Sequence, residues 1–169
     1  MQVFGFKVGM QILITLITIF YSLSINAEEL MGQVIKVIDG DTITILDASK
    51  EQFKIRLGGI DTPEKNQAFG NVSKQSLSEM VAGKEVNVVY NKRGRYGRII
   101  GKVLLNNEDV NLMQVKRGLA WHYKQYEREQ EVEDRALYAQ GEYLAQKDRL
   151  GLWNDKKPMP PWDFRKIPH

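Results

Sequence analysis

The segment "GQVIKVIDGDTITILD", from Gly32 to Asp47, contains two apolar, β-branched runs on either side of Asp39-Gly40. An Asp-Gly pair between two such runs is a strong signal for a tight turn joining antiparallel strands. We therefore predict a β-hairpin over this segment.

Two later segments alternate between apolar and polar residues, as strands with one buried face do. They are 52–57 ("QFKIRL") and 85–90 ("EVNVVY"). In the first of these two Arg56 falls on the polar face, so its side chain is expected to point away from the core. A further strand is predicted over 98–105 ("RIIGKVLL"), where Gly101 suggests a bulge or a close backbone approach.

Helical spacing predicts three helices among these strands. The first begins at a cap on Asn71 and ends at Gly83, the second covers "DVNLMQVKRG" (109–118), and the last covers roughly 126–147. The order is three strands, a helix, two strands and two helices. It predicts an α+β protein built on an OB-fold, a five-stranded Greek-key barrel with helices over one end and one side.

The composition excludes several kinds of site. The chain of 169 residues has no cysteine and two histidines, so thiol chemistry, zinc ribbons and His-built metal centres are ruled out. Any resident metal must be a hard cation held by oxygen atoms. The formal charge of +3 permits a polyanionic partner without requiring one.

The first 27 residues differ from the rest, with Lys7 as the only charge before a long apolar run that ends at Ala27. This pattern predicts a signal peptide over 1–27 and export of the protein, either secreted or periplasmic. An uncleaved N-terminal membrane anchor is the alternative. We expect one domain over 28–155, followed by a proline-rich tail over 156–169 that lies extended along the surface.

Two acids could hold a cation. Asp41 follows the hairpin turn, and Asp61 opens the "DTPE" loop after the third strand. Thr62 precedes a proline, which pushes its backbone into an extended conformation in which its carbonyl can turn outward. Two carboxylates and a carbonyl make an incomplete calcium shell, which leaves room for water or a substrate phosphate. Each acid alone could equally be an ordinary turn or loop residue.

Two arginines could act on a phosphate, because the planar guanidinium matches phosphate oxygens and stays charged. Arg56 lies at a strand end and Arg98 begins the fifth strand. Glu64 is close enough in sequence to Asp61 to activate or orient a water molecule near a metal. Solvated surface positions are the alternative for all three residues.

Taken together, these pieces resemble the staphylococcal nuclease (thermonuclease) family. The resemblance runs in order through "VIDGDTITIL", "FKIRLGGIDTPEK", "RYGRIIGKVLL", "VNLMQVKRGLAWHYKQY" and "RLGLWND", from about Gly32 to Asp155. It implies an OB-fold capped by three helices. It also implies a sugar-nonspecific endonuclease that uses one calcium ion, hydrolyses DNA and RNA at the 5′ P–O bond and leaves 3′-phosphates.

The resemblance assigns roles to particular positions. It places the calcium ligands at Asp41, Asp61 and Thr62 and the catalytic residues at Arg56, Glu64 and Arg98. It places substrate contacts at Arg95, Tyr96 and Tyr126. The family's first wall tyrosine is replaced by Lys124, with Tyr123 beside it, so these two residues are also candidates for substrate binding.

Other residues of the aromatic run have structural interpretations. We expect Trp121 to pack near the last helix, His122 to be structural and Trp153 to anchor the chain end. A nuclease-like module that binds nucleic acid or protein without cutting is the alternative function. The presence of all five acids and arginines favours catalysis.

The expected partners are DNA and RNA, preferably single-stranded or frayed, because a shallow barrel face reaches the backbone best when the bases are splayed. We expect a monomer without stable membrane association once the leader is removed.

Overall fold

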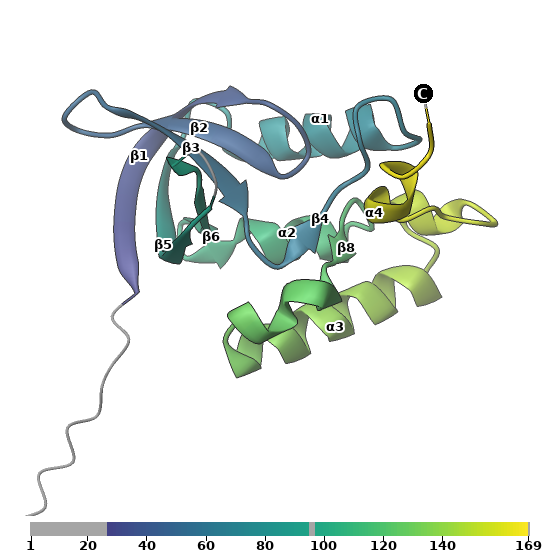
Figure 1. Ribbon diagram of the computed structural model, residues 1–169. Coiled ribbons are helices and arrows are strands. Elements are labelled where there is room, and N and C mark those ends of the chain that lie inside the picture. Colours follow the sequence, from purple (N-terminus) through teal and green to yellow (C-terminus); the bar gives the residue numbers. More distant parts are fainter. Residues whose placement is uncertain (1–26, 95–96, 169) are drawn as a thin grey trace, which may run out of the picture.

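Five strands close into a barrel in this computed structural model, which describes residues 27–94 and 97–168. Antiparallel pairs join the strands in the order β3-β2-β1-β5-β6, and a parallel pairing of β3 with β6 closes the barrel (Figure 1). The predicted OB-fold is confirmed. The barrel strands are β1 (Glu28–Val37), β2 (Thr42–Leu46), β3 (Gln52–Leu57), β5 (Glu85–Arg93) and β6 (Ile99–Leu105).

The apolar residues that alternate with polar ones along the strands are the side chains that fill this barrel. β1 and β2 pair as the predicted hairpin, and β2 pairs in turn with β3. Inward-facing side chains of β2 and β3 are almost completely buried, as expected for a closed barrel with one interior face. They are Ile43, Ile45, Ile55 and Leu57.

Three helices cover the barrel as predicted: α1 (Gly70–Val81), α2 (Val110–Lys116) and α3 (Val132–Lys147). Strand β7 (Glu108–Asp109) leads into α2, where Asp109 caps the helix by accepting from the backbone N–H of Leu112 at 2.9 Å. The Tyr138 hydroxyl of α3 donates to the same carboxylate at 2.9 Å. The Asp109 carboxylate therefore caps α2 and also binds α3 to it.

Two short strands connect the barrel to the segment that precedes α3. They are β4 (Ile60–Asp61) and β8 (Trp121–His122), which pair antiparallel with each other. As predicted, His122 is structural: it is buried and its backbone N–H donates to the Glu142 carboxylate at 3.0 Å. Trp153, in the 3₁₀ turn η3 (Gly151–Asn154), is the predicted buried anchor and packs edge-on against Trp121.

Three local predictions are wrong. Asn71 is not the cap of α1, because Phe69 holds that position in a left-handed conformation with no side-chain cap. The last helix does not begin at Tyr126, since a 3₁₀ segment η2 (Lys124–Glu129) comes first and the backbone is extended at Gln130. The tail is not simply extended, because it forms a short helix α4 (Pro161–Phe164).

Two buried amides fix the loops that carry the site. The Gln114 side chain of α2 donates to the carbonyl of Gly40 at 2.9 Å, which holds the residue before Asp41. Asn111 donates to the carbonyls of Gly58 and Gly101, which holds the end of β3 against β6. Buried amides satisfied in this way specify one backbone arrangement.

No helix within the described ranges is long and apolar enough to cross a membrane. The predicted signal peptide over 1–27 lies almost wholly outside those residues, since only its last residue, Ala27, is described.

Candidate active site

Neighbouring barrel strands bring Asp41 and Arg56 together. Asp41 immediately precedes β2, and the register of β2 with β3 places Thr42 opposite Arg56. The backbone N–H of Leu57 donates to the carbonyl of Asp41 at 2.8 Å. As a result, Nη1 of Arg56 lies 2.8 Å from Oδ2 of Asp41.

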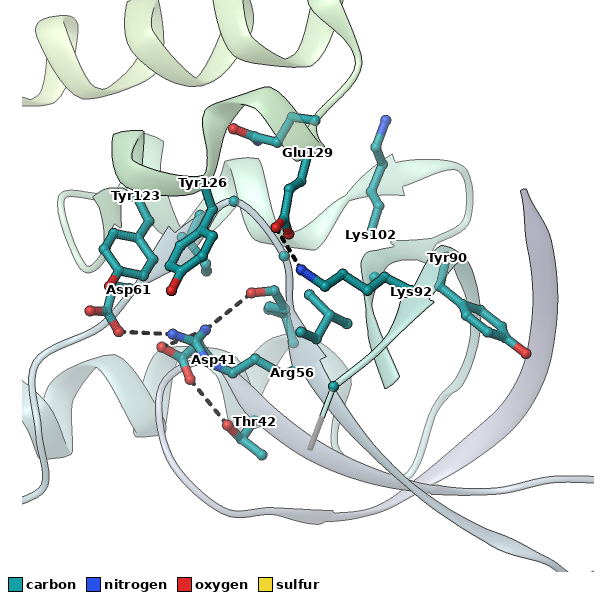
Figure 2. Close-up of a pocket in the computed structure, with 18 of the residues that line it drawn as sticks. Asp41, Thr42, Arg56, Asp61, Tyr90, Lys92, Lys102, Tyr123, Tyr126 and Glu129 are labelled. Atoms are coloured by element: carbon teal, nitrogen blue, oxygen red, sulfur yellow. Dashed lines mark hydrogen bonds and ion pairs between the residues drawn. The ribbon is translucent and has the colours of Figure 1, made fainter. Parts of the chain in front are cut away.

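Asp61 reaches the same guanidinium from the loop strand β4. Nη2 of Arg56 donates to Oδ1 of Asp61 at 2.8 Å. Figure 2 shows the guanidinium lying between the two carboxylates. The Arg56 side chain is only 15% exposed, so it is not a solvated surface arginine.

Both aspartates are buried, with 5% of Asp41 and 2% of Asp61 exposed. Oδ2 of Asp41 accepts from the backbone N–H and the hydroxyl of Thr62 at 2.9 and 2.8 Å. Burial nevertheless raises the pKa of Asp41 from its ordinary value of 3.8 to about 7; the charges of Asp39 and Asp61 add to the rise, while Arg56 and Thr62 oppose it. Burial thus disfavours the charged form of the Asp41 carboxyl.

Carboxylate and carbonyl oxygens are the kind of ligand that a hard cation takes. The described part of the chain contains no cluster of three or more His, Cys, Asp or Glu side chains that could hold a metal. An ion here would rest on the two carboxylates that share Arg56, with the Thr62 carbonyl available as a further oxygen. Water or a substrate phosphate would complete the six to eight oxygens that calcium takes.

The two aspartates line a cavity of about 1020 Å³, and Glu64 and Arg98 line it as well. The Glu64 side chain is 41% exposed and lines this cavity. Arg98 forms no ion pair within the described residues, and its buried Nε has no hydrogen-bond partner there. Arg98 thus differs from Arg56, whose guanidinium pairs with both aspartates.

An aromatic wall borders the cavity. Tyr123 and Tyr126 meet edge to face at 5.0 Å between ring centroids, and both line the cavity (Figure 2). Burial raises the pKa of the Tyr123 hydroxyl. Because every base has a π-face, such rings can stack on a nucleotide without reading its sequence.

Not every predicted contact residue lies at this cavity. Nζ of Lys124 pairs with the buried Glu142 carboxylate at 2.7 Å, and Lys124 lines a separate, smaller pocket. Arg95 and Tyr96 lie outside the described residues. The two acids, Thr62, Glu64, both described arginines and the two tyrosines are the ones that the structure brings together.

Arg165 was missed by the sequence analysis. It lines the cavity, and its Nη2 lies 2.7 Å from Oδ2 of Asp61. The signal available was its position just after the proline-rich segment of the tail, which also contains Trp162. That composition can indicate a packed chain end, but not the cavity that it packs against.

A family model described as "Staphylococcal nuclease homologue" matches residues 54–155. The chain belongs to the staphylococcal nuclease family. It is 38% identical to a Haemophilus influenzae protein named "Uncharacterized endonuclease", over 92% of this chain and 84% of that protein.

Two further relatives agree. An Escherichia coli protein with the same printed name is 39% identical over 90% of this chain and 95% of its own length. A Shigella flexneri protein named "Micrococcal nuclease" is 34% identical over 80% of each chain. The staphylococcal nuclease family match includes Arg56, Asp61 and Glu64, whereas Asp41 precedes it and Arg165 follows it.

Proposed function

We propose that this protein is a calcium-dependent nuclease that cleaves DNA and RNA at the 5′ P–O bond and leaves 3′-phosphate ends. It is a phosphodiester-hydrolysing enzyme of the staphylococcal nuclease family. The observation that carries the proposal is the Arg56 guanidinium, 2.8 Å from both Asp41 and Asp61, in a cavity that Glu64 and Arg98 also line.

The two buried aspartates would provide the carboxylate ligands of the calcium ion. Asp41, Asp61 and the carbonyl of Thr62 would hold one calcium ion, which supplies positive charge beside the scissile phosphate. Magnesium is expected to support little turnover, because it demands tight octahedral geometry from a site with only two carboxylates.

Glu64 and the arginines account for the reaction. The Glu64 carboxylate orients a water molecule and accepts its proton as the water oxygen bonds to phosphorus. The bond from phosphorus to the 5′ oxygen breaks, and that oxygen takes a proton from solvent to give a 5′-hydroxyl. Arg56 and Arg98 stabilise the negative charge that grows on the other phosphate oxygens.

The shape of the site suggests the substrate. Tyr123 and Tyr126 offer stacking surfaces beside the cavity, which suits single strands and frayed duplex ends. We also propose that the protein is exported and acts as a monomer. The apolar stretch before Ala27 supports the export.

The test uses single-stranded DNA and RNA oligonucleotides with calcium, with magnesium and with chelator. Cleavage of both substrates in calcium alone, with ends that phosphatase converts to 3′-hydroxyls, is the expected result. Oligonucleotides that are bound but stay intact in every condition would show the non-catalytic module instead. Equal rates in magnesium and calcium would refute the calcium requirement.

A further inference from the structure

The C-terminal segment is a packed part of the molecule and not a loose end. α4 lies beside β4 and β8 (Figure 1), and Pro161 at its start is buried. The Trp162 ring stacks on Tyr123 at 5.3 Å with an interplanar angle of 10°, and meets Trp121 edge-on at 5.6 Å. These contacts hold the residue that follows α4 against the cavity.

That residue, Arg165, bridges two acids of the site. Its Nη2 donates to Oδ2 of Asp61 at 2.7 Å, and its Nη1 donates to Oε1 of Glu64 at 2.7 Å. The planar guanidinium can meet two carboxylates at once, which a lysine cannot do with the same geometry. Arg165 therefore ties a predicted metal ligand to the predicted base.

The two acids depend on Arg165 to different degrees. Asp61 is also held by Arg56 through its other oxygen at 2.8 Å. The Glu64 carboxylate, in contrast, has no other partner among the described side chains, and it is 41% exposed. Loss of Arg165 would free Glu64 while leaving Asp61 in place.

The tail also steadies the loop that carries Glu64. The Gln67 side chain donates to the carbonyl of Met159 at 2.6 Å and accepts from the backbone N–H of Glu64 at 3.1 Å. A Cβ on Gly70 would lie 1.9 Å from the carbonyl oxygen of Glu64, so only glycine allows this close approach. The backbone of Glu64 is thus fixed, and Arg165 fixes its side chain.

We propose that Arg165 is a positioning residue of this nuclease, which holds the Glu64 carboxylate toward the phosphate site and bridges it to Asp61. The inference rests on the proposed function. It adds a third guanidinium, from the C-terminal tail, to the two that act on the phosphate.

Two variants of the full chain test it, R165Q and R165K, with K166Q as the matched control. Lys166 is the next residue and carries the same charge, but it is 73% exposed, and its one ion pair among the described residues is with Asp163. The measurements are kcat and KM on a single-stranded DNA oligonucleotide, the calcium Kd by calorimetry without substrate, and the midpoint of thermal unfolding.

For R165Q we expect kcat to fall about 10–100-fold, as for other residues that orient a catalytic group, with KM changed less than about threefold. Calcium should bind at least about threefold more tightly, since a positive charge beside Asp61 is gone. R165K should lie between R165Q and the wild type. K166Q should match the wild type.

Each other result overturns the proposal. A rise in kcat together with tighter calcium binding would show that the tail inhibits the site. Weaker calcium binding with a large loss of thermal stability would show a purely structural contact. A wild type that cuts nothing refutes the proposed function, whereas an active wild type with unchanged R165Q refutes only the role of Arg165.

Discussion

Nη2 of Arg56 lies 2.8 Å from Oδ1 of Asp61, and the same guanidinium reaches Asp41 at the same distance. Arg56 is therefore the counter-ion of two buried carboxylates as well as a proposed ligand of the phosphate. Its two roles can be separated, because only one of them needs substrate.

The change Arg56→Gln should affect both roles. We expect kcat to fall by about 10³–10⁵, as for arginines that stabilise a phosphoryl transition state. The metal-free protein should also lose about 3–5 kcal/mol of stability, because the buried Asp41 carboxylate loses the arginine that it pairs with, while Asp61 keeps Arg165. Urea unfolding with and without calcium measures the second effect, and calcium should restore part of the loss.

The control for this prediction is Lys54→Gln, an exposed change two residues earlier on the same strand. It should leave kcat and stability near wild-type values. An Arg56→Gln protein that is as stable as the wild type without calcium would contradict the counter-ion role.

Arg98→Gln should separate catalysis from stability. Arg98 forms no ion pair with any residue that the structure describes, so its loss should change the free energy of unfolding by less than about 1 kcal/mol. The value of kcat should still fall by about 10³–10⁵. Steady-state kinetics and urea unfolding on one preparation measure kcat and the free energy of unfolding. A variant with wild-type kcat would show that Arg98 has no role in the mechanism.

The raised pKa of Asp109, a residue outside the active site, predicts that the stability of the protein depends on pH. Burial raises the pKa of its carboxyl above the ordinary value of 3.8 in the folded protein. The folded state then binds this proton more tightly than the unfolded state, so the contribution of Asp109 to stability falls as pH rises from 3.8 through the folded pKa.

The variant Asp109→Asn isolates this effect, because an amide oxygen can still accept from the Leu112 N–H and the Tyr138 hydroxyl but does not titrate. The stability of the variant relative to the wild type should rise as the pH is raised from 3.8 through the folded pKa of Asp109, as followed by urea unfolding. A difference that is constant with pH, or that falls, would be inconsistent with a raised pKa.

Asn71→Ala tests the corrected start of α1. A side chain that caps a helix typically contributes about 1 kcal/mol, but α1 has its cap position at Phe69 and no side-chain cap. We expect the substitution to cost less than about 0.5 kcal/mol. Asp109→Ala, which removes a true cap, should cost about 1 kcal/mol or more by the same thermal or urea measurement.

Much of the barrel could be predicted because its strands and its first turn follow from short, local sequence patterns. Apolar residues alternate along β2 and β3, and the Asp-Gly turn joins β1 to β2. The register of β2 with β3 then sets Asp41 beside Arg56. The pieces of the site that lie on or next to these strands were found for that reason.

The remaining features depend on contacts between distant residues. Arg165 reaches Asp61 across 104 positions of the chain, and no local periodicity reports such a contact. The first turn of α1 is set by the approach of Gly70 to Glu64, not by the capping preference of Asn71. Lys124 faces Glu142 because β8 ends and η2 begins there, which the sequence pattern did not predict.

The most direct test is a crystal structure of the protein with calcium and a nucleoside 3′,5′-bisphosphate. The account predicts one ion in contact with Asp41 and Asp61, and Arg56 and Arg98 both donating to the same phosphate. An ion bound elsewhere, or an Arg98 guanidinium that does not reach that phosphate, would contradict it.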